Sequence, residues 1–177
     1  MRIEGGIIMN VMDAILSRRS VRKYASQEVS DDVIKELLEA GMSAPSAENE
    51  RPWHFIVIRD RKILDEIAKF RSGSGMLKDA PMAVLVCGDS KLDIHKGCLV
   101  QDCSAATENI LIAVQGKRLG AVWLDIYSRR DWITATQKLL DIPEHVIPIS
   151  LIPIGYPAEK KPQANRYDAS RVHYEHW

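Results

Sequence analysis

The chain has no surplus of charge, few cysteines and no long hydrophobic run, and each shortage excludes a class of protein. Its 24 Lys and Arg balance 24 Asp and Glu, which excludes a general nucleic-acid binder with its excess of positive charge. The longest apolar runs, 80–87 and 146–154, are strand-length and far shorter than the roughly 18 residues of a membrane span. Three cysteines without a C-x-x-C pair favour a reducing compartment over a disulfide framework, so we expect a cytoplasmic protein.

Common catalytic motifs are also missing. The sequence contains no G-x-G-x-x-G after a strand, no phosphate-binding G-x-x-x-x-G-K-[ST], no H-E-x-x-H and no G-x-S-x-G. The five histidines are scattered, and we expect no metal site. Any chemistry must therefore be sought in less specific patterns.

Apolar periodicity predicts a mixture of helices and strands in one domain of 177 residues. Helices are expected at 11–16, 30–41, 62–70, 99–119 and 128–140, and strands at 55–58, 82–87, 121–125 and 147–154. Gly120 is expected to cap the longest helix, and two prolines predict that the last strand is irregular or at an edge. Because the order lacks a clean βαβ alternation, an α+β fold is favoured. Residues 1–9 are expected to be a flexible start.

The segment 17–24 carries four bases, Arg18, Arg19, Arg22 and Lys23, and no acid. Arginine forks pair bidentately with phosphate, and the hydroxyl of Ser20 adds a hydrogen bond. The segment leaves a helix end, so its side chains can converge on one anion. Composition alone favours a solvated basic loop over an anion site.

Three further segments have the character of binding loops. In 44–53, two prolines enclose small and amide residues between a helix and a strand. In 117–123, a helix end turns into a strand, and Gly120 and Ala121 are expected to offer exposed backbone N–H groups to a planar ligand. In 155–166, a glycine-proline turn is followed by a late arginine. Each pattern alone is typical of an ordinary connection.

Taken in order, the four segments resemble the nitroreductase family of FMN-dependent oxidoreductases. The resemblance covers about residues 10–168 and rests on the runs Arg-Arg-Ser-Val-Arg, Ala-Pro-Ser…Pro-Trp, Leu-Gly-Ala-Val-Trp and Ile-Gly-Tyr-Pro. It implies a single FMN-binding domain with a central mixed β-sheet flanked by helices. It also implies an intertwined homodimer with FMN at the interface and a tail, 160–177, that packs on the partner chain.

The resemblance further implies a set of cofactor-binding residues and no catalytic side chain, because the flavin carries the chemistry. The basic segment and Arg166 would hold the phosphate and the pyrimidine edge of the ring. The loop 45–49 would come from the partner chain, and the turn 120–123 would bring a backbone N–H to the ring. The residues implied are Arg18, Arg19, Ser20, Val21, Arg22, Pro45, Ser46, Ala47, Asn49, Gly120, Ala121, Val122, Trp123 and Arg166.

The implied reaction is hydride transfer from NADH or NADPH through FMN to a small acceptor such as a nitroaromatic or a quinone, with ping-pong kinetics. No nucleic-acid or membrane partner is expected. Arg51 stands where many relatives have glutamine, and 70–79 lacks a longer insertion, so the acceptor stays open. Two alternatives also stay open: a reductive dehalogenase-like or other flavin reaction on the same fold, and a non-catalytic flavin-binding dimer.

Overall fold

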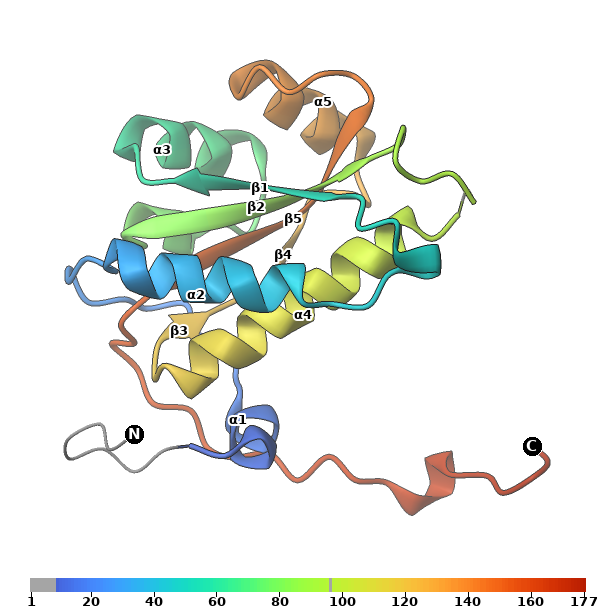
Figure 1. Cartoon of the computed structure of the whole chain (residues 1–177). Coiled ribbons are helices and arrows are strands. Elements are labelled where there is room, and N and C mark those ends of the chain that lie inside the picture. Colours follow the sequence, from blue (N-terminus) through green and yellow to red (C-terminus); the bar gives the residue numbers. More distant parts are fainter. Residues whose placement is uncertain (1–8, 96) are drawn as a thin grey trace.

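The computed structural model describes residues 9–95 and 97–177, with helices on both faces of a five-stranded sheet (Figure 1). The predicted flexible start therefore lies outside the described residues, apart from Met9. The strands are β1 (Trp53–Ile58), β2 (Met82–Asp89), β3 (Gly120–Ala121), β4 (Leu124–Asp125) and β5 (Val146–Gly155). The helices are α1 (Val11–Ser17), α2 (Asp31–Met42), α3 (Arg61–Phe70), α4 (Leu99–Gly116) and α5 (Arg130–Leu139), with short 3-10 turns η1 (Ala47–Asn49), η2 (Gly75–Lys78) and η3 (Ala169–Arg171).

The α+β class is confirmed, but the strands of this chain form an antiparallel sheet rather than a mixed one. The strand order is β1-β2-β5-β3, with β4 also paired to β5, and every named pair is antiparallel. The connection through α3 and η2 leaves the end of β1 and enters β2 at the same end of the sheet, where Ile58 pairs with Ala83. Among the described residues, parallel pairing is limited to the isolated bridge between Ser20 and Ala121. The strand expected at 121–125 is divided into β3 and β4.

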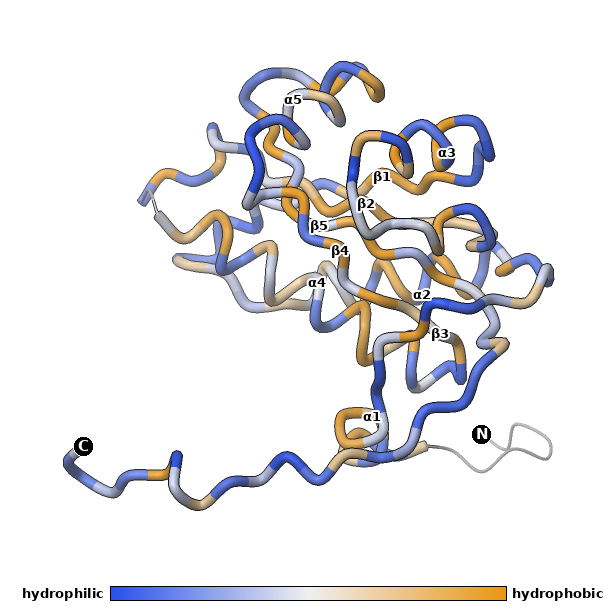
Figure 2. Tube along the Cα trace, turned by 180° about the vertical axis from the view of Figure 1, so that it is seen from behind, coloured by the Kyte–Doolittle hydropathy of each residue, from blue (hydrophilic) through white to orange (hydrophobic). Residues whose placement is uncertain are grey.

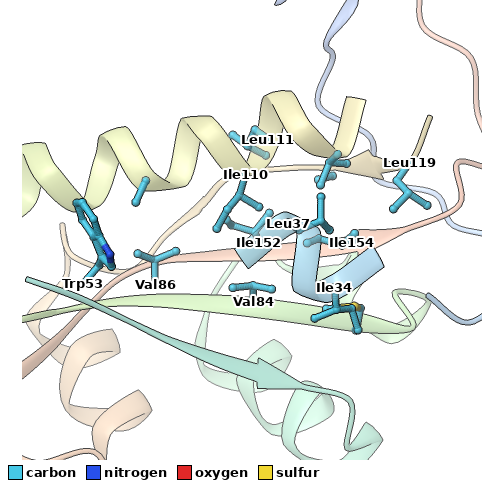
Figure 3. Packing of buried hydrophobic residues seen from close by; sticks show 14 of the residues in the cluster. Ile34, Leu37, Trp53, Val84, Val86, Ile110, Leu111, Leu119, Ile152 and Ile154 are labelled. Atoms are coloured by element: carbon cyan, nitrogen blue, oxygen red, sulfur yellow. The ribbon is translucent and has the colours of Figure 1, made fainter. Parts of the chain in front are cut away.

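The central strand β2 is buried on both faces, as its continuous apolar run predicts. Val84 and Val86 pack toward α2 and α4, where Figure 3 shows them facing Ile110. Ala83 and Leu85 point to the opposite face and join the cluster under α3 and α5. Two apolar layers, one on each side of the sheet, therefore hold the helices in place.

The proline-containing strand β5, expected to be irregular or at an edge, is irregular and lies in the middle of the sheet. It pairs with β2 on one side and with β3 and β4 on the other. The predicted irregularity is confirmed, since the register shifts between Val86 and Cys87, next to Pro148. Pro153 lies opposite the gap between β3 and β4, where the missing N–H removes no ladder hydrogen bond.

The end of α4 is formed by a different residue from the one the sequence predicts. The helix ends at Gly116, and Arg118 takes the left-handed conformation with φ +59°. The Leu119 N–H then donates to the Val114 carbonyl at 2.9 Å, which closes a Schellman motif. Gly120 is instead the first residue of β3.

Two segments extend from the body of the chain. Helix α1 projects below the end of α4, and the chain beyond β5 runs past α1 and away from the sheet (Figure 1). Figure 2 shows a strongly hydrophobic stretch on α1, and its Val11, Met12, Ile15 and Leu16 are exposed. Residues 160–177 are also exposed almost throughout. Among the described helices, none is long and apolar enough to cross a membrane.

Candidate functional site

Three of the arginines that the sequence analysis selects line one groove. Arg18, Arg19 and Arg166 surround a volume of about 680 Å³ between the end of α1, the helix α4 and the tail. The groove is further lined by Ile15, Leu16, Glu108, Gln163, Ala164, Asn165 and Tyr167. Residues almost 150 positions apart in the sequence are thus brought together into a strongly basic surface.

Glu108 is a member of this groove that the sequence analysis missed. Its carboxylate lies 3.4 Å from Nε of Arg18. The arginine side chain is mostly covered, whereas the glutamate is about half exposed. No local pattern relates positions 18 and 108, so only the packing of α1 against α4 could reveal the pair.

Arg19 points to backbone carbonyls. Its Nε donates to the carbonyl of Pro162 at 3.0 Å, and Nη1 donates to those of Leu16 (3.3 Å) and Arg18 (2.6 Å). The remaining Nη2 is buried and has no hydrogen-bond partner among the described residues. Arg19 therefore fastens the tail to the end of α1 and retains one unused donor.

The segment after the arginines is attached to β3. Ser20 bridges Ala121, and the Val21 N–H donates to the Ala121 carbonyl at 2.9 Å. The exposed N–H groups predicted at Gly120 and Ala121 are not found, because β3 lies between β5 and this segment and both residues are buried. Residues 122–123 connect β3 to β4, the first buried and the second half-buried.

A carboxylate and a tyrosine fix the far side of the same segment. The Arg22 N–H donates to Oε1 of Glu159 at 2.7 Å, and this hydrogen bond is the main reason that the pKa of Glu159 lies below its usual value. The hydroxyl of Tyr24 donates to the Val21 carbonyl at 2.7 Å, and burial raises its pKa. The Arg22 side chain stays exposed. The backbone of the basic segment is thus held rigidly while a guanidinium remains available.

The loop predicted to line the flavin lies away from the groove, at the first turn of α4. Among its predicted site residues, Pro45 and Asn49 are exposed. Ser46 and Ala47 are half-buried. The Ala47 N–H meets Asp102 in the first turn of α4, whereas Ser17, beside the groove, accepts from Gln115 in the last turn. The two contacts lie thirteen residues apart on α4, which corresponds to roughly 20 Å of helix. The groove itself meets α4 between them, at Glu108. Within one chain the loop and the groove do not meet.

This loop has an unusual backbone. Glu48, Asn49 and Arg51 have φ of +46°, +58° and +49°, a region that favours glycine. The Ser46 hydroxyl accepts the Arg51 N–H at 2.9 Å and closes the turn. Left-handed non-glycine residues are costly and concentrate at functional sites. The conformation therefore singles out 46–51 as a candidate binding loop.

Glu50 ties the loop to the segment that precedes α4. Its side chain is 5% exposed and accepts the N–H groups of Ile94 (3.1 Å) and His95 (3.2 Å). Nδ1 of His95 lies 2.6 Å from the same carboxylate. The hydrogen bond to Glu50 raises the pKa of His95, and in return His95 lowers the pKa of Glu50.

The Glu50–His95 pair predicts a defined pH dependence of stability. The His95 contribution is complete below its ordinary pKa of 6.5 and is lost as the pH rises through the raised value. The Glu50 contribution is complete above its ordinary pKa of 4.5 and is lost as the pH falls through the lowered value. The melting-temperature difference between wild type and H95A should therefore be largest between about pH 4.5 and 6.5 and should shrink at higher pH. A difference of equal size at about pH 9 would contradict this account, and H173A, in the exposed tail, is the control.

Comparisons with known proteins agree with this architecture. Residues 15–90 match the family model described as "Nitroreductase family". A "Putative NADH dehydrogenase/NAD(P)H nitroreductase" of Methanothermobacter thermautotrophicus is 48% identical over 169 residues, covering 96% of this chain and 88% of the relative. A crystal structure with the same description from Parabacteroides distasonis superposes with a TM-score of 0.91 at 40% identity, covering 94% and 98% of the two chains.

A second similar structure contains a ligand. It is that of a Desulfovibrio desulfuricans protein described as a nitroreductase in complex with FMN, with a TM-score of 0.81, 31% identity and coverage of 94% and 97%. The sheet between two helical layers is thus a nitroreductase-like α+β fold. Since the sequence similarity also extends over nearly the whole length, the chain belongs to the nitroreductase family.

Proposed function

We propose that this protein is an FMN-dependent oxidoreductase that transfers hydride from NADH or NADPH to small electrophilic acceptors such as nitroaromatics or quinones. The observation that carries the proposal is the convergence of Arg18, Arg19 and Arg166 on one groove in a chain of the nitroreductase family. The descriptions of the relatives, which include an NAD(P)H nitroreductase and a nitroreductase in complex with FMN, support the same function.

The residues of the groove fit the phosphate of FMN. The guanidinium groups of Arg18 and Arg166 would supply the charge-assisted donors that a phosphate dianion requires, while Arg19 uses Nε and Nη1 on backbone carbonyls. The unused Nη2 of Arg19 is a buried donor that lacks a partner among the described residues. The groove therefore presents several cationic N–H donors, which are the groups that bind an anion.

The protein side chains would bind and orient the cofactor. When bound, FMN supplies the redox chemistry by taking hydride from the nicotinamide and passing it to the acceptor. Arg18 and Arg166 would hold the phosphate end, and the exposed Arg22 would place positive charge near the ring and raise its reduction potential. Donor and acceptor would use the same open face in turn, so we expect ping-pong kinetics.

A homodimer would complete the site. The loop 46–51 is anchored in the first turn of α4, whereas the groove meets this helix at Glu108, so the two are separate within one chain. In a two-fold dimer the loop of one protomer would reach the groove of its partner. The exposed apolar face of α1 and the exposed tail 160–177 supply surface for such an interface. We expect a sedimentation mass of about twice the 20.0 kDa of one chain.

The decisive experiment is the visible spectrum of the purified protein after incubation with FMN. We expect an oxidised flavin spectrum that remains after desalting and bleaches under anaerobic NADH or NADPH. Recovery of the spectrum on adding a nitroaromatic or a quinone would identify the acceptor class. A protein that retains no FMN refutes the proposal, and a bound flavin that neither nicotinamide reduces refutes the reductase activity.

A further inference from the structure

The loop 46–51 rests on a buried carboxylate at the start of α4. Asp102 is only 6% exposed, and its Oδ1 accepts the Ala47 N–H at 3.2 Å. Its Oδ2 is buried without a hydrogen-bond partner among the described residues. Burial of a carboxylate is costly unless both of its oxygens accept hydrogen bonds. An apolar residue at position 102 would therefore make the fold more stable than aspartate does.

The location of Asp102 reduces part of that cost. It lies in the first turn of an 18-residue helix, where the free N–H groups and the helix dipole favour negative charge. Its Oδ1 accepts a hydrogen bond from outside the helix, from the N–H of Ala47, the residue before the left-handed turn. The carboxylate thus joins the rigid core helix to the strained part of the loop.

The strained loop needs this support. A left-handed conformation is unfavourable for a non-glycine residue and persists only where the surroundings determine it. The hydrogen bond from Ala47 to Asp102 fixes the entry to the turn. The Ser46–Arg51 hydrogen bond closes the turn, and Glu50 anchors its far end. Of these anchors, Asp102 is the one that fixes the loop to the core helix α4.

We propose that Asp102 is a positioning residue that holds Ala47 and the left-handed turn in the conformation that presents loop 46–51 to FMN. The proposal rests on the function proposed above. It assigns to Asp102 no contact with the cofactor, since its free oxygen is covered by protein. Its effect passes through the backbone N–H of Ala47.

The first test compares D102A with T107V. Thr107 is a fully buried residue of the same helix whose hydroxyl bonds to Ser150 and to the Cys103 carbonyl, away from the loop. Hydrogen exchange of a peptide spanning 45–52 is measured on FMN-free protein, and FMN affinity by flavin fluorescence. We expect D102A to speed exchange and to weaken FMN binding, each about tenfold. T107V should lower the melting temperature without either effect, and D102N, which keeps an acceptor oxygen, should stay close to wild type.

A second variant removes the donor instead of the acceptor. A47P deletes the N–H that Asp102 accepts, and Ser46 is already extended (φ −141°, ψ 156°), as a residue before proline must be. In a double-mutant cycle, A47P/D102A should lose no more than the more affected single variant. Additive losses, unchanged exchange in D102A, or equal effects in T107V would overturn the proposal. Failure of wild-type protein to bind FMN would instead refute the proposed function, and the exchange measurement would still decide the role of Asp102.

Discussion

Replacing Arg18 with alanine should weaken FMN binding by about tenfold to a hundredfold and leave riboflavin binding nearly unchanged. A hydrogen bond to a charged group contributes about 1.5–3 kcal/mol, which corresponds to that range of affinity. Riboflavin lacks the phosphate, so the ratio of the two dissociation constants isolates the phosphate contact. Titration of each variant with both flavins, followed by fluorescence, gives the ratio.

Two matched variants sharpen the test of Arg18. K23A removes a positive charge from the same segment, but Lys23 does not line the groove, so its FMN-to-riboflavin ratio should match wild type. E108Q removes the carboxylate that pairs with Arg18 in the FMN-free protein and should tighten FMN binding, because the phosphate no longer meets a nearby negative charge. Equal losses for FMN and riboflavin in R18A would mean that Arg18 supports the fold rather than the phosphate.

Gly120→Ala should destabilise the fold by about 1–3 kcal/mol, the usual cost of overpacking a core. A Cβ at this position would lie 2.6 Å from Cγ1 and 2.9 Å from Cβ of Val21, and neither atom belongs to a flexible chain end. The clash would push the basic segment away from β3, so FMN affinity should fall with stability. Urea unfolding and FMN titration measure the two effects.

The control for Gly120 is another glycine of the same region. Gly116, the last residue of α4, has open space around its Cβ position, so G116A should be neutral or stabilising by up to about 1 kcal/mol. Val21→Ala in the G120A background should restore part of the stability, because the nearest contact opens from 2.6 to 2.9 Å. A G120A protein as stable as wild type would show that β3 and the basic segment can separate at little cost.

Several elements followed directly from local sequence. Asn10 and Ser30 cap α1 and α2 through their side chains, as their position before apolar periodic residues predicts. The uninterrupted apolar run of β2 predicts a strand buried on both faces, and this prediction is confirmed. These features are local because a cap or a strand depends on residues within a few positions of one another.

Other elements depended on distant contacts, and here the sequence predictions were incomplete or wrong. Prolines in 147–154 left open whether the strand would be irregular or at an edge, and the structure shows an irregular central strand in which the register shift beside Pro148 and the gap opposite Pro153 accommodate both rings. Gly120 was expected to cap α4, but Arg118 takes that role. Gly120 is needed instead for its close approach to Val21, a residue 99 positions earlier.

Local sequence was enough to predict the family and the arginines of the groove, because the basic segment, the proline loop and the glycine turns are local runs in a fixed order. The folded chain alone shows that Arg19 is turned to carbonyls, that Glu108 faces Arg18 and that Asp102 accepts from Ala47. The fold also places the loop at the first turn of α4 and the groove at Glu108, in the middle of the same helix. The physical reason is that hydrogen bonds and ion pairs between distant residues depend on how α1, α4 and the loops pack, and no local pattern encodes that packing.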